Sequence, residues 1–331
     1  MSTAEPCWQD AFDATPELLI VVFPSALRSD RVYGPLLRRT IEIARQQSRV
    51  VAETRALDAM EDADEVIVGL RPGRFDTDTD VVVVVRGVRA DVDPAALVDA
   101  EGRPLWAPGP TGRVRELVRT GTGSSPESSE AARDEIPASL FELPGRTWVI
   151  ASGDARTRAR TAFAHGPARS RQAPTIEPRA DHALVTVRID GASLVRRIPA
   201  LQPTRILGPV GHRLDEVSFE LSAGSIDAVA PTGEADGGAP PSAERVIKAT
   251  LSYANGDAAA LAEVTVREVL EAIARKKPDE VAWLSDGKVA VERPPPGRRV
   301  VVTAPLAPRL VAALLHAGTA RLALPVGDPP P

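Results

Sequence analysis

The sharpest cluster of acidic side chains is the run DTDTD at residues 76–80, in which carboxylates alternate with threonines. Alternating carboxylates are typical of calcium loops, because Ca²⁺ prefers several oxygen ligands. An EF-hand loop beginning at Asp76 needs glycine at its sixth position and glutamate at its twelfth, but Val81 and Gly87 stand there. A solvated hairpin turn is therefore the preferred interpretation, and Asp76, Asp78 and Asp80 stay the candidate metal ligands.

Other residue types with catalytic chemistry do not form a recognisable constellation in the sequence. Ser152 and Thr303 each follow an expected strand and precede an expected helix, where a nucleophile or a phosphate loop is often found. No Gly-x-Ser-x-Gly elbow or phosphate-binding loop is present, so helix capping is the preferred interpretation. The histidines lack metal-ligand spacing: His165, His182, His212 and His316. We expect no catalytic residue and no cofactor.

Cys7 is the one cysteine, so no intrachain disulfide can form. It lies a few residues before the first expected strand, where a bacterial lipoprotein carries its acylated cysteine. The preceding Ala4-Glu5-Pro6 is not a lipobox, and residues 1–6 contain no signal peptide. As written, the sequence predicts a cytoplasmic protein with an inert thiol. If the true start lies further upstream or the chain has been trimmed, Cys7 becomes a lipidation site and the protein belongs to the cell envelope.

Composition and charge limit the classes of protein to which the chain can belong. Of the 331 residues, 43% are hydrophobic and 26% charged, which predicts a soluble globular protein with enough apolar residues for real cores. A net charge of −5 argues against nucleic acid as a partner, because such binders neutralise phosphates. No apolar stretch reaches the roughly 18 residues of a spanning helix, so a membrane attachment would depend on Cys7. Lysine accounts for only four of the 40 basic residues, and GC-rich codon usage explains the excess of arginine better than anion recognition does.

Apolar patterns predict short strands alternating with helices in the first half of the chain. The five valines at 81–85 suit a strand covered on both faces. Arg156, Arg158 and Arg160 alternate within an expected helix, which indicates a charged, solvated surface. We also expect Trp148 and Trp283 to lie in the core. Strands are expected at 17–23, 65–70, 80–88, 104–106, 113–118, 139–142 and 146–151, and helices at about 30–47, 93–99 and 154–164.

The second half repeats this alternation. Asp257 is expected to cap a helix whose apolar side chains recur at helical spacing, namely Val266, Val269, Leu270 and Ile273. Residues 208–212 are expected to form a turn, and a last helix should carry Leu306, Leu310, Leu314 and Leu315. Strands are expected at 182–189, 215–221, 225–229, 245–253, 288–291 and 299–303, with a short helix near 192–198. The loops at 121–135 and 231–243 have no assignable role.

Three short motifs recur in the same order in both halves, which predicts an internal duplication. The pairs are residues 64–66 with 215–217, 93–97 with 257–261, and 144–146 with 296–298. We therefore expect an α+β fold of two tandem similar halves, each a mainly antiparallel sheet with helices packed on one side. The expected parts are an N-terminal segment (1–16), a first repeat (17–165), a linker (166–180), a second repeat (181–325) and a proline-rich tail (326–331).

The layout resembles uncharacterised bacterial lipoproteins from GC-rich genomes. The resemblance is carried by Cys7 ahead of the strand at 17–23 and by the helix start VYGPLL at 32–37. It implies an envelope location and brings no catalytic residues. We expect a non-catalytic binding or scaffolding protein with an unknown ligand or protein partner. The alternatives are an enzyme whose site consists of dispersed aspartates and arginines between the halves, with Asp76, Asp78 and Asp80 tested first, and a cytoplasmic subunit of a larger assembly.

Overall fold

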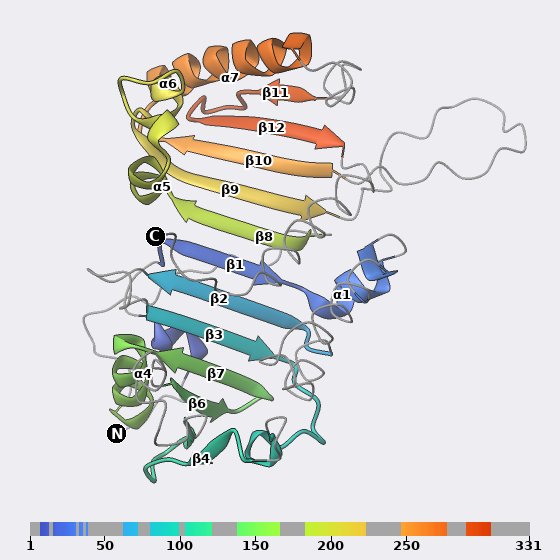
Figure 1. The fold of residues 1–331 in the computed structure, drawn as a ribbon, viewed down its shortest axis with the longest axis vertical. Coiled ribbons are helices and arrows are strands. Elements are labelled where there is room, and N and C mark those ends of the chain that lie inside the picture. The colour runs from blue at the N-terminus through green and yellow to red at the C-terminus, as the bar shows by residue number, and fades with distance from the viewer. Residues whose placement is uncertain are drawn as a thin grey trace, which may run out of the picture. The chain divides into compact units, whose positions relative to one another are not determined.

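The computed structural model describes residues 7–12, 16–30, 33–35, 38, 62–71, 80–98, 103–120, 138–165, 183–222, 246–276 and 289–305. The chain divides into two compact units, residues 1–177 with 311–331 and residues 178–310. Every described pair of strands within each unit is antiparallel. The expected α+β class with mainly antiparallel sheets is confirmed (Figure 1).

The first unit contains seven of the strands. Their order across the sheet is β1 (Leu18–Val22), β2 (Glu65–Arg71), β3 (Asp80–Arg86), β7 (Thr147–Ser152), β6 (Ala138–Leu143), β5 (Arg115–Arg119) and β4 (Trp106–Pro108). Its described helices are η1 (Trp8–Ala11), α1 (Pro24–Ser29), η3 (Pro94–Ala96) and α4 (Asp154–His165). The hairpin expected around Pro144 is present between β6 and β7, with Gly145 and Arg146 at φ values of 74° and 57°.

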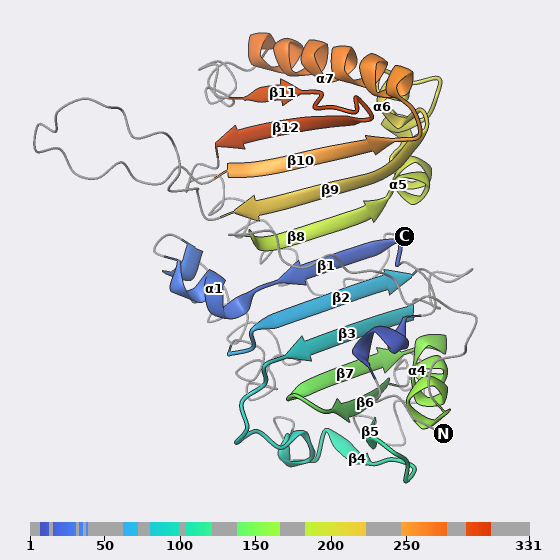
Figure 2. The same ribbon diagram turned by 180° about the vertical axis from the view of Figure 1, so that it is seen from behind.

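One face of this sheet is buried under α4 and η1 (Figure 2). Register places Ile67, Val84 and Val149 side by side on that face, and all three are fully buried. The helix α4 contributes Phe163, whose ring meets that of Phe141 edge-on at 5.2 Å. On the same face Phe12 fills the space over Gly69, where a Cβ atom would lie 2.5 Å from the Phe12 ring. The N-terminal η1 is thus part of the core.

The opposite face of the sheet is covered in part by described residues between β3 and β5. Val85 and Trp148 lie on this face and pack with two of those residues, Leu97 and Trp106. The prediction that Trp148 lies in the core is confirmed, whereas Trp283 lies outside the described residues. Because β3 has buried valines on both faces, its continuous apolar run is explained as expected.

The second unit contains a five-stranded sheet in the order β8 (Ala183–Asp190), β9 (Leu214–Ser222), β10 (Val246–Tyr253), β12 (Arg299–Pro305) and β11 (Ala290–Glu292). Four helical segments accompany it: α5 (Gly191–Arg197), η5 (Pro199–Leu201), α6 (Gly208–Gly211) and α7 (Gly256–Lys276). In both views α7 runs along the β11 side of the sheet (Figures 1 and 2).

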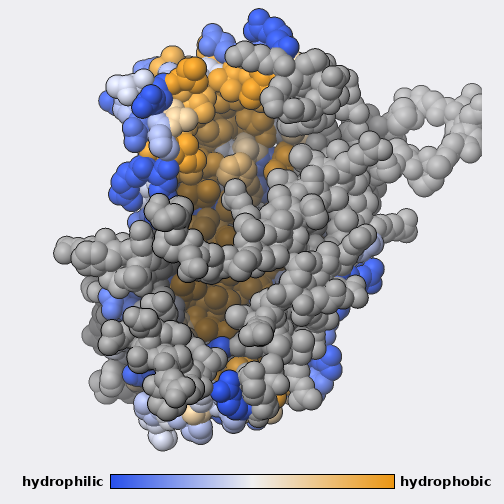
Figure 3. All heavy atoms as spheres, in the orientation of Figure 1, coloured by the Kyte–Doolittle hydropathy of each residue, from blue (hydrophilic) through white to orange (hydrophobic). Residues whose placement is uncertain are grey.

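The two faces of the second sheet differ sharply in polarity. One face carries the neighbours Val217, Leu251 and Val300, which pack against three alanines of α7: Ala258, Ala259 and Ala262. Along the same face the apolar pattern continues to Phe219, whose side chain is 37% exposed. Figure 3 shows hydrophobic residues gathered over α7 and the strands beside it. The other face carries polar side chains such as Glu220 and Lys248, as expected of a half-buried antiparallel sheet.

Two local expectations need correction, and one short helix was not expected. That helix is α1, which spans Pro24–Ser29 with Asp30 as its C-cap. Of the helix expected at about 30–47, residues 33–35 and 38 are described after Asp30, and they are helical. Residues 208–211 form the short helix α6 rather than a turn, with Pro209 near its start. The cap of α7 is Asn255, whose Oδ1 accepts the N–H of Ala258 at 2.9 Å, while Asp257 lies within the first turn.

Candidate functional site

Asp80 is the one candidate metal ligand that the structure describes, since Asp76 and Asp78 lie outside the described residues. It is the first residue of β3, and its Oδ1 accepts the backbone N–H of Ala155 at 3.1 Å. Its Oδ2 forms an ion pair with Arg158 of α4. The hydrogen bond from Ala155 satisfies a backbone N–H at the N-terminus of α4, where such groups lack partners within the helix. The carboxylate therefore fastens α4 to the sheet.

A small cavity adjoins Asp80. Its lining includes the side chains of Arg71, Asp80 and Arg158 together with apolar groups of Phe12 and Val82. Its volume of about 20 Å³ is enough for roughly one water molecule. Small-molecule sites are typically larger, about 300–1,000 Å³. This cavity suits a bound water beside an ion pair rather than an organic ligand.

The most elaborate polar cluster surrounds Glu116 of β5. Its side chain is 4% exposed, and both carboxylate oxygens accept hydrogen bonds from Arg160 Nε, at 3.1 and 2.9 Å. The hydroxyl of the fully buried Ser139 donates to Glu116 Oε1 at 2.7 Å and accepts from Arg156 Nε at 2.7 Å. The cluster joins β5, β6 and α4 through a single buried negative charge.

The electrostatics of this cluster favour the ionised form of the Glu116 carboxylate. Burial by itself raises the pKa of Glu116, but hydrogen bonds from Arg160 and Ser139 and the charges of Arg160 and Arg156 outweigh it, so the pKa is lowered. The same hydrogen bond to Glu116 raises the pKa of Arg160. A carboxyl group that acts as a general acid near neutral pH needs a raised pKa instead.

The arginines of α4 are partly exposed, and each also has a polar partner in the sheet. Arg156 and Arg160 are four residues apart, so they share one side of the helix and converge on Ser139 and Glu116. Arg158 lies on another side and pairs with Asp80. The spacing of the arginines along the sequence already indicates which of them share a side of the helix. What the sequence lacked was the pairing partner, because Glu116 lies on a strand far away in the chain.

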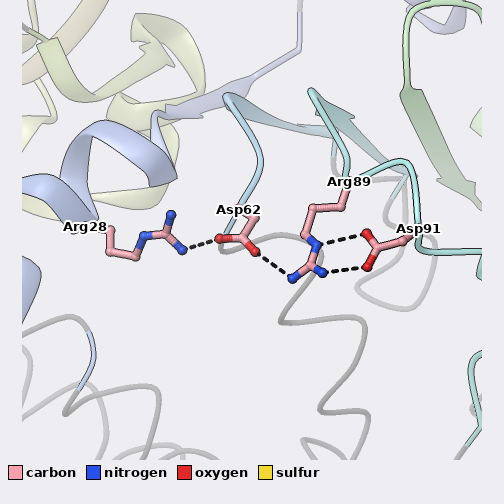
Figure 4. Close-up of polar contacts among 4 residues, drawn as sticks. All are labelled: Arg28, Asp62, Arg89 and Asp91. Atoms are coloured by element: carbon pink, nitrogen blue, oxygen red, sulfur yellow. Dashed lines mark hydrogen bonds and ion pairs between the residues drawn. The ribbon is translucent and has the colours of Figure 1, made fainter.

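A second polar cluster is an exposed ladder of alternating charges (Figure 4). Arg28 of α1 pairs with Asp62, Asp62 pairs with Arg89 at 3.3 Å, and Arg89 contacts both oxygens of Asp91. The arginine side chains are 42% and 52% exposed. Hydrogen bonds from the arginines lower the pKa of Asp62 and of Asp91. The ladder joins α1 to the ends of β2 and β3, and its charges are paired with one another.

The remaining candidates lie apart from these clusters. Cys7 is exposed and precedes η1, and its backbone N–H donates to Asp10 Oδ2 at 3.1 Å. His212 is exposed beside α6, whereas His182 and His316 lie outside the described residues. Within the described ranges, histidine, cysteine and acidic side chains do not gather in threes as a metal site would need.

The same ranges contain no helix long and apolar enough to cross a membrane. Comparison of the chain with protein-family models, with curated proteins and with solved structures found no match in any of the three.

Proposed function

We propose that this protein is a non-catalytic binding or scaffolding protein built from two related α+β units. The observation that carries the proposal is the state of Glu116, the most buried carboxylate of the described residues. It is paired with Arg160 and hydrogen-bonded to Ser139, so its bonds hold β5, β6 and α4 together. Asp80, Asp62 and Asp91 are likewise engaged with arginines. Carboxylates paired in this way stabilise a scaffold, and the lowered pKa of Glu116 leaves it without a proton to donate at neutral pH.

The proposal includes the tandem duplication, and the strand order supports it. In each unit a strand, a short helix and two further neighbouring strands come first: β1, α1, β2, β3 and β8, α5, β9, β10. A hairpin then returns so that its second strand pairs with the last of these: β6–β7 and β11–β12. Between them, the described residues 88–106 of the first unit pack on the face that carries Val66, and α7 packs on the face that carries Val217 in the second.

The resemblance to bacterial lipoproteins enters the proposal through Cys7. The residue after it is held by aromatic contacts: Trp8 meets Phe12 edge-on at 6.3 Å, and its ring centroid lies 5.8 Å from the Arg86 guanidinium. Ala11 is 1% exposed. An acyl group on Cys7 would therefore hold the first unit close to the bilayer without a spacer. The unmodified thiol of a cytoplasmic protein is the alternative.

Three measurements test this function. An intact mass spectrum of the protein from its source organism reports whether Cys7 carries a diacyl modification, and a native spectrum reports a retained ligand. A panel of ester, phosphoester, glycoside and peptide substrates tests for turnover in parallel. We expect no turnover that depends on Asp80 or Glu116. Reproducible turnover that Asp80→Asn or Glu116→Gln abolishes in a folded protein would overturn the proposal in favour of an enzyme.

A further inference from the structure

The connection between β8 and β9 has a composition unlike the rest of this acidic chain. From Gly191 to Leu214 it contains four arginines and one histidine, and no aspartate or glutamate. All of these basic residues are exposed: Arg196, Arg197, Arg205, His212 and Arg213. We call residues 191–214 the basic connection. The whole chain has a net charge of −5, so the basic connection is a local reversal of sign.

Two aliphatic side chains are exposed within the basic connection. Ile206 is 84% exposed, the highest value among the large hydrophobic residues that the structure describes, and Ile198 is 40% exposed. Single exposed apolar residues are common on protein surfaces. Here the strongly exposed Ile206 directly follows Arg205, and Ile198 directly follows Arg196 and Arg197. Exposed aliphatic groups among cations are typical of surfaces that enter the boundary between lipid headgroups and acyl chains.

The basic connection is held in a defined shape. The N–H of Leu207 donates to Ala200 O at 3.1 Å and that of Gly208 to Arg205 O at 2.8 Å, which closes a compact turn around Ile206. Leu201 and Val210 are buried beneath the turn. The hydroxyl of the buried Tyr253 donates to Val210 O at 3.1 Å. Because the base is fixed, the exposure of Ile206 is a property of the folded unit.

Two of the acidic groups next to the basic connection have partners outside it or in the backbone. Asp190 accepts the N–H of Ser193 at 2.8 Å and caps α5, and Glu216 pairs with Arg188 at 3.0 Å. Asp215 is exposed on β9, directly after the basic connection, and Asp257 is exposed in the first turn of α7. Figure 3 shows hydrophilic residues at the end of the second unit where α5 and α6 lie.

We propose that the basic connection is a docking surface for an anionic lipid bilayer, with Ile206 and Ile198 entering the interface and the surrounding arginines binding lipid phosphates. Charge complementarity between the arginines and lipid phosphates favours an anionic partner. The exposed isoleucines favour a lipid bilayer over a nucleic acid, because proteins that bind single-stranded nucleic acids combine cations with aromatic side chains. The inference names a partner for the binding function proposed above and rests on it to that extent. It does not depend on acylation of Cys7.

Vesicle sedimentation with the full-length protein carrying Cys7→Ser tests the proposal. We expect binding to phosphatidylglycerol-containing vesicles at 50 mM salt, little binding to pure phosphatidylcholine, and loss of binding at 0.5 M salt. Ile206→Ser should weaken binding about tenfold, because it removes the apolar side chain that enters the bilayer on binding. Arg197→Gln and Arg205→Gln should each weaken it about fivefold and reduce its dependence on salt.

Leu261→Ser is the matched control. Leu261 is 51% exposed, but it lies on α7 one turn from Asp257, so its replacement should leave vesicle binding unchanged. Unchanged thermal unfolding of each variant establishes that the fold is retained. Absence of binding to anionic vesicles overturns the proposal, as does equal weakening by Leu261→Ser. Tighter binding to duplex DNA that is indifferent to Ile206→Ser would overturn it in favour of a nucleic acid. These outcomes leave the test for turnover independent, so failure of either proposal is recognisable.

Discussion

Arg160 holds one of the most buried charges of the described residues in its ionised state. If the Arg160 guanidinium is removed, Glu116 keeps its hydrogen bond from Ser139 but loses its main cationic partner. Arg156 does not replace it, because its Nε donates to the Ser139 hydroxyl. The cost of leaving a fully buried charge unpaired is roughly 3–5 kcal/mol. Since 38% of the Arg160 side chain is exposed, solvent would compensate part of this loss.

We therefore expect Arg160→Ala to lower the free energy of unfolding by about 2 kcal/mol at pH 7, measured by urea denaturation. Arg275→Ala is the control, because its pair with Glu271 is 3.8 Å long and more than 70% of each side chain is exposed. That variant should unfold almost as the parent protein does. Similar losses from both substitutions would contradict the role given to the Glu116 cluster.

The lowered pKa of Glu116 makes a prediction about acid. A carboxyl group whose pKa is lower in the folded state stabilises the fold above its unfolded pKa, here about 4.5, and loses that contribution as the pH falls through the folded pKa. The difference in unfolding free energy between the parent protein and Glu116→Gln should be largest near neutral pH and shrink below about pH 4.5. Urea unfolding at several pH values measures it. A difference that does not change with pH would refute the assignment.

At the scale of elements, the N-terminus of α7 distinguishes capping from a merely favourable charge. Asn255→Ala removes the acceptor for the Ala258 N–H, and we expect a loss of about 1 kcal/mol in unfolding free energy. Asn255→Ser keeps an acceptor and should restore most of it. Asp257→Ala should cost less than Asn255→Ala, because Asp257 acts through the helix dipole. Chemical denaturation monitored by circular dichroism gives all three values, and the reverse order would return the cap to Asp257.

Elements with strong local signals could be predicted from the sequence. The apolar runs of β1, β2 and β3, the hairpin of β6 and β7, and the helix α4 lie within a few residues of their expected bounds. Capping was less predictable, because Asn255 and Asp257 are both good N-cap residues and the choice depends on where the preceding strand ends. The Glu116 cluster could not be predicted, since it forms only when β5, β6 and α4 come together through tertiary contacts.

At the scale of the whole molecule, the sheets of the two units set the order of local stability. Hydrogen exchange is slowest where backbone groups are both paired and covered. In the first unit Ile67, Val84 and Val149 are fully buried on β2, β3 and β7, whereas β4 has three residues and ends at Pro108. In the second unit β10 is hydrogen-bonded to β9 and β12, whereas β11 has three residues at the edge of its sheet.

We expect amide exchange, followed by mass spectrometry, to be slowest in β2, β3 and β7 of the first unit and in β10 of the second. It should be clearly faster in β4 and β11. Because each unit has its own core, Arg160→Ala should speed exchange in β5, β6 and α4 more than in β10. Faster exchange spread evenly over both units would contradict two separate cores, whereas a local increase would link the Glu116 cluster to the stability of its own unit.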